Sequence, residues 1–140
     1  AVGEVPPALP EKDIQDRPVS FDGYKGKVVL LHFWSPRPTP GADKIGEVKR
    51  LYDEYHAQGL EAIGVSLFTY PQEVEAYAKG RQMSWPQICD GKSWSSPLVT
   101  TFAVKALPYA IIIGKDGKIA AVDPEGHLED AVKAALAGPG

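Results

Sequence analysis

The sequence predicts an α/β fold with a mixed central sheet, helices on both faces, and a C-terminal β-hairpin followed by a helix. Short apolar runs typical of buried strands alternate with segments whose apolar residues recur every three or four positions. Such alternation is typical of parallel strands joined by crossover helices. Near the end of the chain, a tight glycine turn joins two further strands and adds an antiparallel edge.

Size and charge indicate a single domain with no nucleic-acid surface. The chain has 140 residues, of which 44% are apolar, so it can bury a core without a covalent staple. Its net charge of −3 shows no basic excess for binding nucleic acid. We expect an extended, proline-rich lead-in over residues 1–17 and one domain over residues 18–137. No apolar run is long enough for a transmembrane helix.

The first elements follow from local patterns. Residues 18–27, "PVSFDGYKGK", predict a short strand and then a turn at Gly23 and Gly26. Residues 28–34 form an almost continuous apolar run, which predicts a strand covered on both faces. A helix is expected over about residues 42–58, because apolar residues recur every three or four positions and so share one face: Ile45, Val48, Leu51, Tyr52 and Tyr55. Gly59 is expected to end this helix.

The middle of the chain predicts two more strands and two helices. Residues 60–68, "LEAIGVSLF", read as a buried strand, and residues 84–90, "SWPQICD", as a short strand or extended segment. Between them, residues 69–82 predict a helix with Pro71 in its first turn. Ser95 or Ser96 is expected to cap a helical turn that starts at Pro97.

The C-terminal elements have the clearest local signals. "YAIII" and "IAAV" flank the turn sequence "GKDGK", which predicts a β-hairpin. The last segment, "HLEDAVKAALAG", predicts a helix whose inward face carries Leu128, Ala131, Val132, Ala135 and Leu136.

Four segments together carry a family resemblance: "GKVVLLHFW", "GLEAIGVSL", "WPQICDGKSW" and "FAVKALPYAIIIGKDGKIAAV". In this order and spacing, the chain resembles the thioredoxin superfamily, and within it the TlpA/ResA-like thiol–disulfide oxidoreductases of the AhpC/TSA–redoxin group. The resemblance covers about residues 15–137. It implies a thioredoxin-like fold and export to a periplasm or cell envelope.

The cysteines of that family's active-site motif are absent. The motif continues F-W-A-x-W-C-x-x-C after its strand, and Phe33 and Trp34 match its start. Arg37 then replaces the second tryptophan, and the two cysteine positions fall on Pro38 and Gly41. An alternative register follows peroxiredoxins that read T-P-G-C, and it places Ala42 at their peroxidatic cysteine.

Either register removes dithiol chemistry from this position. Thiol–disulfide exchange needs one thiolate to attack and a second thiol to resolve the mixed disulfide. The chain contains one cysteine, Cys89, which excludes an intramolecular disulfide and any cysteine-based metal site. The sequence predicts no cofactor, no metal site and no catalytic residue, with Cys89 as the one candidate.

The resemblance also implies a binding groove. The family's cis-proline falls on Pro108 in "ALPYA", and the segment before that proline offers backbone groups to which an extended peptide could pair. We therefore predict a binding or structural module for a polypeptide partner. The predicted groove comprises Trp34, Arg37, Pro38, Leu107, Pro108 and Tyr109. The alternative is that these side chains only shield the former active site.

A second hypothesis keeps redox chemistry and assigns it to Cys89, as a thiol–disulfide oxidoreductase or a peroxiredoxin-like protein. Asp90 next to it would raise the pKa of the thiol, which disfavours the thiolate. The simpler interpretation is a small apolar residue packed near the sheet. The sequence leaves both open.

The remaining signals concern histidines and the ends of the chain. His32, His56 and His127 share no metal-ligand spacing, and His32 is expected to be a hydrogen-bonded strand histidine where thioredoxins often carry a buried acid. A third hypothesis makes this chain one module of a longer exported protein, because its proline-rich start and "AGPG" end resemble linkers. Any signal peptide is expected to have been removed or to lie outside this sequence.

Overall fold

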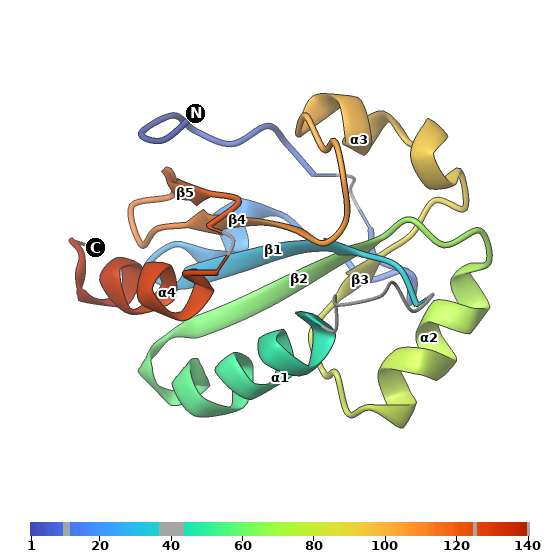
Figure 1. The fold of residues 1–140 in the computed structure, drawn as a ribbon, viewed down its shortest axis with the longest axis horizontal. Helices are drawn as coiled ribbons and strands as arrows, with labels where there is room; N and C mark the ends of the chain where they lie inside the picture. Colours follow the sequence, from blue (N-terminus) through green and yellow to red (C-terminus); the bar gives the residue numbers. More distant parts are fainter. Residues whose placement is uncertain (10–11, 37–43, 125, 140) are drawn as a thin grey trace.

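The structure is a computed structural model that describes residues 1–9, 12–36, 44–124 and 126–139 (Figure 1). Its strands are β1 (Val28–Trp34), β2 (Leu60–Ser66), β3 (Gln87–Ile88), β4 (Tyr109–Ile113) and β5 (Ile119–Val122). Its α-helices are α1 (Lys44–Tyr55), α2 (Pro71–Gly80), α3 (Pro97–Thr101) and α4 (Leu128–Ala137).

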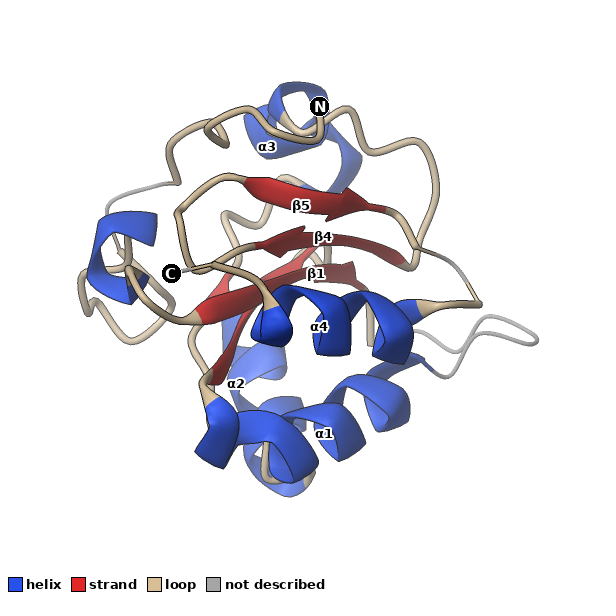
Figure 2. Ribbon diagram, turned by 90° about the vertical axis from the view of Figure 1, so that its left-hand side faces the viewer, coloured by secondary structure: helices blue, strands red, loops and turns tan. Residues whose placement is uncertain are grey.

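The five strands form one mixed sheet in the order β3-β2-β1-β4-β5. β1, β2 and β3 are parallel, whereas β4 runs antiparallel to β1 and β5 antiparallel to β4. α1, α2 and α4 cover one face of the sheet, and α3 lies on the other with the N-terminal segment (Figures 1 and 2). The predicted fold class, including the C-terminal hairpin and helix, is confirmed.

β1 lies at the centre of two apolar layers. Val28, Leu30 and Trp34 belong to the layer beneath α1, α2 and α4. The alternating residues Val29, Leu31 and Phe33 belong to the opposite layer, which includes residues of α3. Successive side chains of a strand point to opposite faces, so a strand buried on both faces must be apolar almost throughout. His32 is the exception in this run.

The strand expected in residues 18–27 is absent, and that prediction is wrong. Residues Phe21–Tyr24 instead form a 3₁₀ helix, in which the Gly23 amide donates to the Ser20 carbonyl at 3.3 Å. Gly26 has φ +84°, a conformation in which glycine is free of steric penalty. Two glycines in four residues favour consecutive turns over extended backbone.

The predicted helix ends agree with the structure. α1 continues into a short 3₁₀ turn, His56–Gln58, which ends at Gly59. Gly59 has φ +109°, and its backbone N–H donates a hydrogen bond to the His56 carbonyl. α2 begins at Pro71. Ser96 caps α3, because its hydroxyl accepts a hydrogen bond from the Leu98 amide at 3.3 Å.

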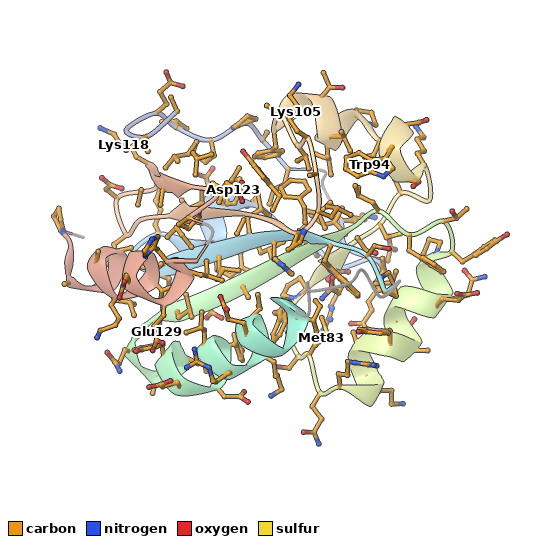
Figure 3. The ribbon with its side chains drawn as sticks, viewed as in Figure 1. Met83, Trp94, Lys105, Lys118, Asp123 and Glu129 are labelled. Carbon is orange, nitrogen blue, oxygen red and sulfur yellow. The ribbon has the colours of Figure 1, made fainter. Side chains whose placement is uncertain are left out.

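The C-terminal hairpin is closed by backbone hydrogen bonds. The Gly114 amide donates to the Lys118 carbonyl at 2.8 Å, and Gly117 has φ +81° in the turn. α4 then packs back against the sheet with Leu128, Val132 and Ala135 buried, and the other two predicted inward residues lie half-buried. Glu129, labelled in Figure 3, joins α4 to α1 by accepting a hydrogen bond from the Tyr55 hydroxyl at 2.6 Å.

Residues of the N-terminal segment pair with both outer strands of the sheet. On β5, the Gly3 amide donates to the Ile119 carbonyl and the Ile119 amide donates to the Glu4 carbonyl, each at 2.8 Å. On β3, the Ile14 amide donates to the Gln87 carbonyl at 2.9 Å. In the part of the chain described, no helix is long and apolar enough to cross a membrane.

Candidate functional site

The ends of several strands lie together along one edge of the sheet, by which we mean the side where strands begin or end and not an outermost strand. β1, β2 and β3 are parallel, so their C-terminal ends share this edge. β4 runs the other way and begins there, with Tyr109 opposite Phe33. The segment just before β4 therefore lies beside the end of β1. In α/β sheets, this edge is the usual location of binding sites.

The segment that precedes β4 is exposed and has unpaired backbone groups. Lys105 (labelled in Figure 3) and Ala106 are exposed, and Leu107, Pro108 and Tyr109 are half-buried. Among the described residues, the backbone groups of residues 105–107 make no hydrogen bond to one another or to other segments. The Leu107–Pro108 peptide bond is cis. Three of the predicted groove residues thus lie together.

Of the other three predicted groove residues, only Trp34 lies among the described residues, and it is buried. Trp34 is only 2% exposed; its indole N–H donates to Gln87 Oε1 at 2.9 Å, and its ring packs on Tyr77 at 5.3 Å between centroids. Trp34 is therefore a core residue, which differs from its predicted position in the groove. Arg37 and Pro38 lie outside the described residues, as do the alternative positions Gly41 and Ala42.

A small pocket lies beneath Pro108, on the face of the sheet that carries α1 and α4. Its volume is about 30 Å³. Parts of β1, α1, β4, α4 and the loop between β5 and α4 line it, including His32, Glu47, Pro108, Tyr109, Asp123 and Leu128. Asp123 is labelled in Figure 3. This volume is enough for a water molecule or a chemical group of that size.

His32 is a buried polar residue that lines this pocket. It is 2% exposed, and by strand alternation it points to the same face as Leu30 and Trp34. Its Nε2 atom has no hydrogen-bond partner among the described residues. Burial lowers the pKa of the imidazole from 6.5 to about 4, so the ring is neutral at pH 7. The prediction that His32 is fully hydrogen-bonded is therefore wrong at Nε2.

Tyr109 forms part of the pocket wall and also packs into the opposite layer. Its ring meets Phe33 edge-on, with the centroids 6.0 Å apart. Burial, with a smaller contribution from Asp123, raises the pKa of its hydroxyl. The hydroxyl is therefore protonated over the whole physiological range of pH.

Cys89 lies at the same edge of the sheet but away from this pocket. It directly follows β3, and three strand spacings of about 4.8 Å separate β3 from β4, roughly 14 Å in all. Its Sγ donates to the Phe68 carbonyl at 3.1 Å, and the side chain is half-buried. Burial raises the pKa of the thiol, and Asp90 adds to this against an opposing hydrogen bond from Gly91. The protonated thiol is the favoured form, and it is a poor nucleophile.

The carboxylate of Asp90, next to Cys89, accepts hydrogen bonds from the loop that follows it. The Lys92 amide donates to Asp90 Oδ1 at 2.9 Å, and the Ser96 hydroxyl donates to Asp90 Oδ2 at 2.7 Å. Among the described residues, no group of three or more His, Cys, Asp or Glu side chains is arranged to hold a metal ion.

Sequence reasoning did not find the contributions of α1 and of the β5–α4 loop to the pocket. Glu47 and Asp123 line it from segments more than 70 residues apart in the sequence. One available signal was "DPEG", residues 123–126, a turn sequence placed directly after the last strand and therefore near a sheet edge.

Comparison with known proteins gives a consistent family assignment. The model of the AhpC/TSA family matches residues 2–122. The thiol-disulfide oxidoreductase ResA of Geobacillus thermodenitrificans is 28% identical over 119 residues, which cover 85% of this chain and 67% of the relative. The chain thus spans about two thirds of the length of the ResA proteins it matches.

Two further similarities extend this result. Chloroplastic peroxiredoxin Q of Sedum lineare is 28% identical over 142 aligned positions, covering 94% of this chain and 75% of the relative. Among solved structures, the thioredoxin domain of a thiol-disulfide oxidoreductase from Bacteroides vulgatus superposes with a TM-score of 0.81 at 23% identity, covering 97% and 98% of the two chains. The thioredoxin-like fold predicted from the sequence is confirmed.

Proposed function

The chain belongs to the AhpC/TSA family, and we propose that it acts as a binding module for an extended polypeptide, without dithiol redox chemistry. One observation carries this proposal. Residues 105–107 have backbone groups without hydrogen-bond partners among the described residues, directly before Pro108. The ResA proteins to which the chain is similar are, by name, thiol-disulfide oxidoreductases. The chain has a single cysteine, so it contains no dithiol.

The number of cysteines limits what the chain can do to a disulfide. Cys89 alone could attack a disulfide, but this chain has no second thiol to release the mixed disulfide, so that thiol would have to come from another molecule. The hydrogen bond from Sγ to Phe68 further favours the protonated sulfur. A catalytic cycle of exchange would therefore depend on a thiol from outside the chain.

Strand addition is the binding mode that fits the exposed segment. A peptide aligned with residues 105–107 can form backbone hydrogen bonds, each worth about 1 kcal/mol net. Two or three such bonds alone give weak association, so specificity requires side-chain contacts. The half-buried side chains of Leu107 and Tyr109 offer apolar surface for these contacts.

The second candidate function is a one-cysteine redox protein. The similarity to peroxiredoxin Q favours it, as does the position of Cys89 at the same sheet edge. The raised pKa of the thiol and its distance from Pro108 weigh against it. We therefore rank polypeptide binding first.

Two assays separate these functions. Insulin reduction with dithiothreitol and peroxide turnover are measured on the wild type and on Cys89→Ser. We expect both proteins to match the uncatalysed background. Turnover by the wild type that disappears in Cys89→Ser would establish the redox function instead.

Binding is tested with peptides selected from a random phage-displayed library. We expect amide signals of Lys105, Ala106 and Leu107 to shift in NMR spectra when a selected peptide is added. Methylation of alternate peptide nitrogens should weaken binding, whereas methylation of the intervening nitrogens should not, because only every second amide of an added strand faces the protein. Signals that move only elsewhere would contradict strand addition at this segment.

A further inference from the structure

The unpartnered Nε2 atom of His32 requires an explanation. A buried polar atom without a hydrogen bond costs about 1–3 kcal/mol, and such atoms are rare in folded proteins. His32 lines the roughly 30 Å³ pocket that Pro108 also lines. A group that enters this pocket and hydrogen-bonds to Nε2 would remove the cost.

We propose that this pocket is a subsite for one hydroxyl-bearing side chain, serine or threonine, of a polypeptide bound along residues 105–107. The proposal rests on the proposed function and adds to it the chemistry of one partner residue. It is argued only from described residues: His32 of β1, the Pro108–Tyr109 start of β4 and the loop after β5 line the pocket together with Glu47 of α1 and Leu128 of α4.

The size of the pocket restricts the side chain that can enter. A volume of about 30 Å³ admits a group the size of a water molecule, such as a hydroxyl. Aromatic, lysine and arginine side chains are too large. Pro108, Pro124 and Leu128 give the pocket apolar walls, which suit the methyl group of threonine.

The chemistry of a neutral imidazole favours a hydroxyl over other small polar groups. Nε2 donates or accepts a hydrogen bond according to the tautomer. A hydroxyl can do either, so it satisfies Nε2 in both tautomers. A carboxylate of the partner would meet the acidic side chains Glu47 and Asp123 in the pocket wall, which disfavours aspartate and glutamate.

The position of the pocket fits a peptide paired with the exposed segment. Pro108 directly follows residues 105–107 and also lines the pocket. Side chains along an added strand alternate in direction, so one residue of the peptide can point down at Pro108 while its neighbours point away. The subsite therefore predicts a serine or threonine preference at a single position, flanked by positions without it.

The test is peptide selection from a random library on the wild type, on His32→Leu and on His127→Gln, an exposed-histidine control. We expect serine or threonine to be enriched at one position with the wild type and the control. With His32→Leu, peptides should still be selected but without this enrichment. Replacing the enriched serine by alanine should weaken binding to the wild type about 3- to 10-fold, with a much smaller effect on His32→Leu.

A spectroscopic measurement keeps the proposal testable if His32→Leu does not fold. In ¹H–¹⁵N spectra of the wild-type histidine rings, the His32 Nε2 resonance should shift when the serine peptide binds and stay in place with the alanine peptide. Equal shifts with both peptides would overturn the subsite.

The remaining outcomes separate failure of the serine or threonine subsite from failure of the proposed polypeptide binding. The subsite is overturned, and polypeptide binding stands, if the selected peptides show no serine or threonine enrichment at any position. The same holds if the enrichment persists with His32→Leu. A pocket occupied only by water would give this result. If no peptide is enriched with any of the three proteins, both the binding function and the subsite are overturned.

Discussion

His32 is the one titratable side chain in the central strand, and its protonation couples folding to pH. In the folded protein, burial lowers its pKa to about 4, whereas the unfolded chain has the ordinary value near 6.5. Between these values the unfolded state binds a proton that the folded state does not. The free energy of unfolding must therefore fall as the pH falls through this window.

We predict a loss of roughly 3 kcal/mol in the free energy of unfolding from this histidine between about pH 7 and pH 4. Below pH 4 both states are protonated, so His32 makes no further contribution. Urea denaturation at several pH values measures the effect, and the difference between the wild type and His32→Leu isolates it from the carboxylates. Identical pH dependence in the two proteins would show that His32 is not buried as a neutral ring.

At the level of single residues, sequence reasoning succeeded where local chemistry decides. Pro71 was identified from helix-start preferences, as was a cap at Ser95 or Ser96, of which Ser96 is the cap in the structure; Gly59 was identified from its place at a helix end. The unsatisfied Nε2 of His32 could not be found this way, because its surroundings come from α1, β4 and the β5–α4 loop. Trp34 was assigned to the groove from the family motif, which carries no information on Gln87, the residue 53 positions away that accepts the indole hydrogen bond.

Among the elements, β2 and β3 are joined at one point of close contact. Gly64 of β2 lies against the side-chain amide of Gln87, which in turn accepts the hydrogen bond from the Trp34 indole. A methyl group at position 64 would lie 2.6 Å from Gln87 Cδ and 2.7 Å from Nε2, and would also meet Oε1. Three strands therefore depend on a glycine at this position.

We predict that Gly64→Ala destabilises the protein by about 1–3 kcal/mol, because Gln87 must move and lose the Trp34 hydrogen bond. Urea denaturation measures the change. The matched control is Gly80→Ala at the end of α2, where a methyl group meets nothing within 4 Å; it should be neutral or stabilising by up to about 1 kcal/mol. Equal stabilities of the two variants would contradict this account of the contact.

Most elements were predictable because their signals are local. The hairpin follows from "GKDGK", and α1 and α4 follow from apolar spacing. The prediction of a strand in residues 18–27 was wrong because a short apolar segment with two glycines satisfies both a strand pattern and a turn pattern. Contacts elsewhere in the chain decide between the two patterns, and the sequence pattern does not record them.

At the scale of the molecule, the sheet order places β1 between β2 and β4. All seven residues of β1 are buried, whereas β5 alternates between buried and exposed positions. Local opening requires less free energy where fewer apolar contacts are lost. Protection of the backbone amides against hydrogen exchange should therefore decline from β1 toward the outer strands.

We predict that amide hydrogen exchange is slowest in β1 and the adjacent parts of β2 and β4, and faster in β3 and β5. Exchange followed by NMR in the native protein measures this gradient residue by residue. Uniform protection across all five strands would indicate that the sheet opens only as one unit.

Strand and helix alternation was enough to predict the class of fold, but it left the order of the strands open. That order depends on which strands meet in space, and the family resemblance supplied the thioredoxin-like arrangement that periodicity alone could not. The solved domain from Bacteroides vulgatus, at a TM-score of 0.81, agrees with it.

The pairing of Gly3 and Glu4 with β5, and of Ile14 with β3, has a consequence for encounters between copies of this protein. An open sheet margin invites strands from other molecules, which is a common route to aggregation. Here residues of the same chain occupy hydrogen-bonding positions on both margins. If the proposed binding function holds, an incoming strand would find the unpaired backbone ahead of Pro108 more open than either margin of the sheet.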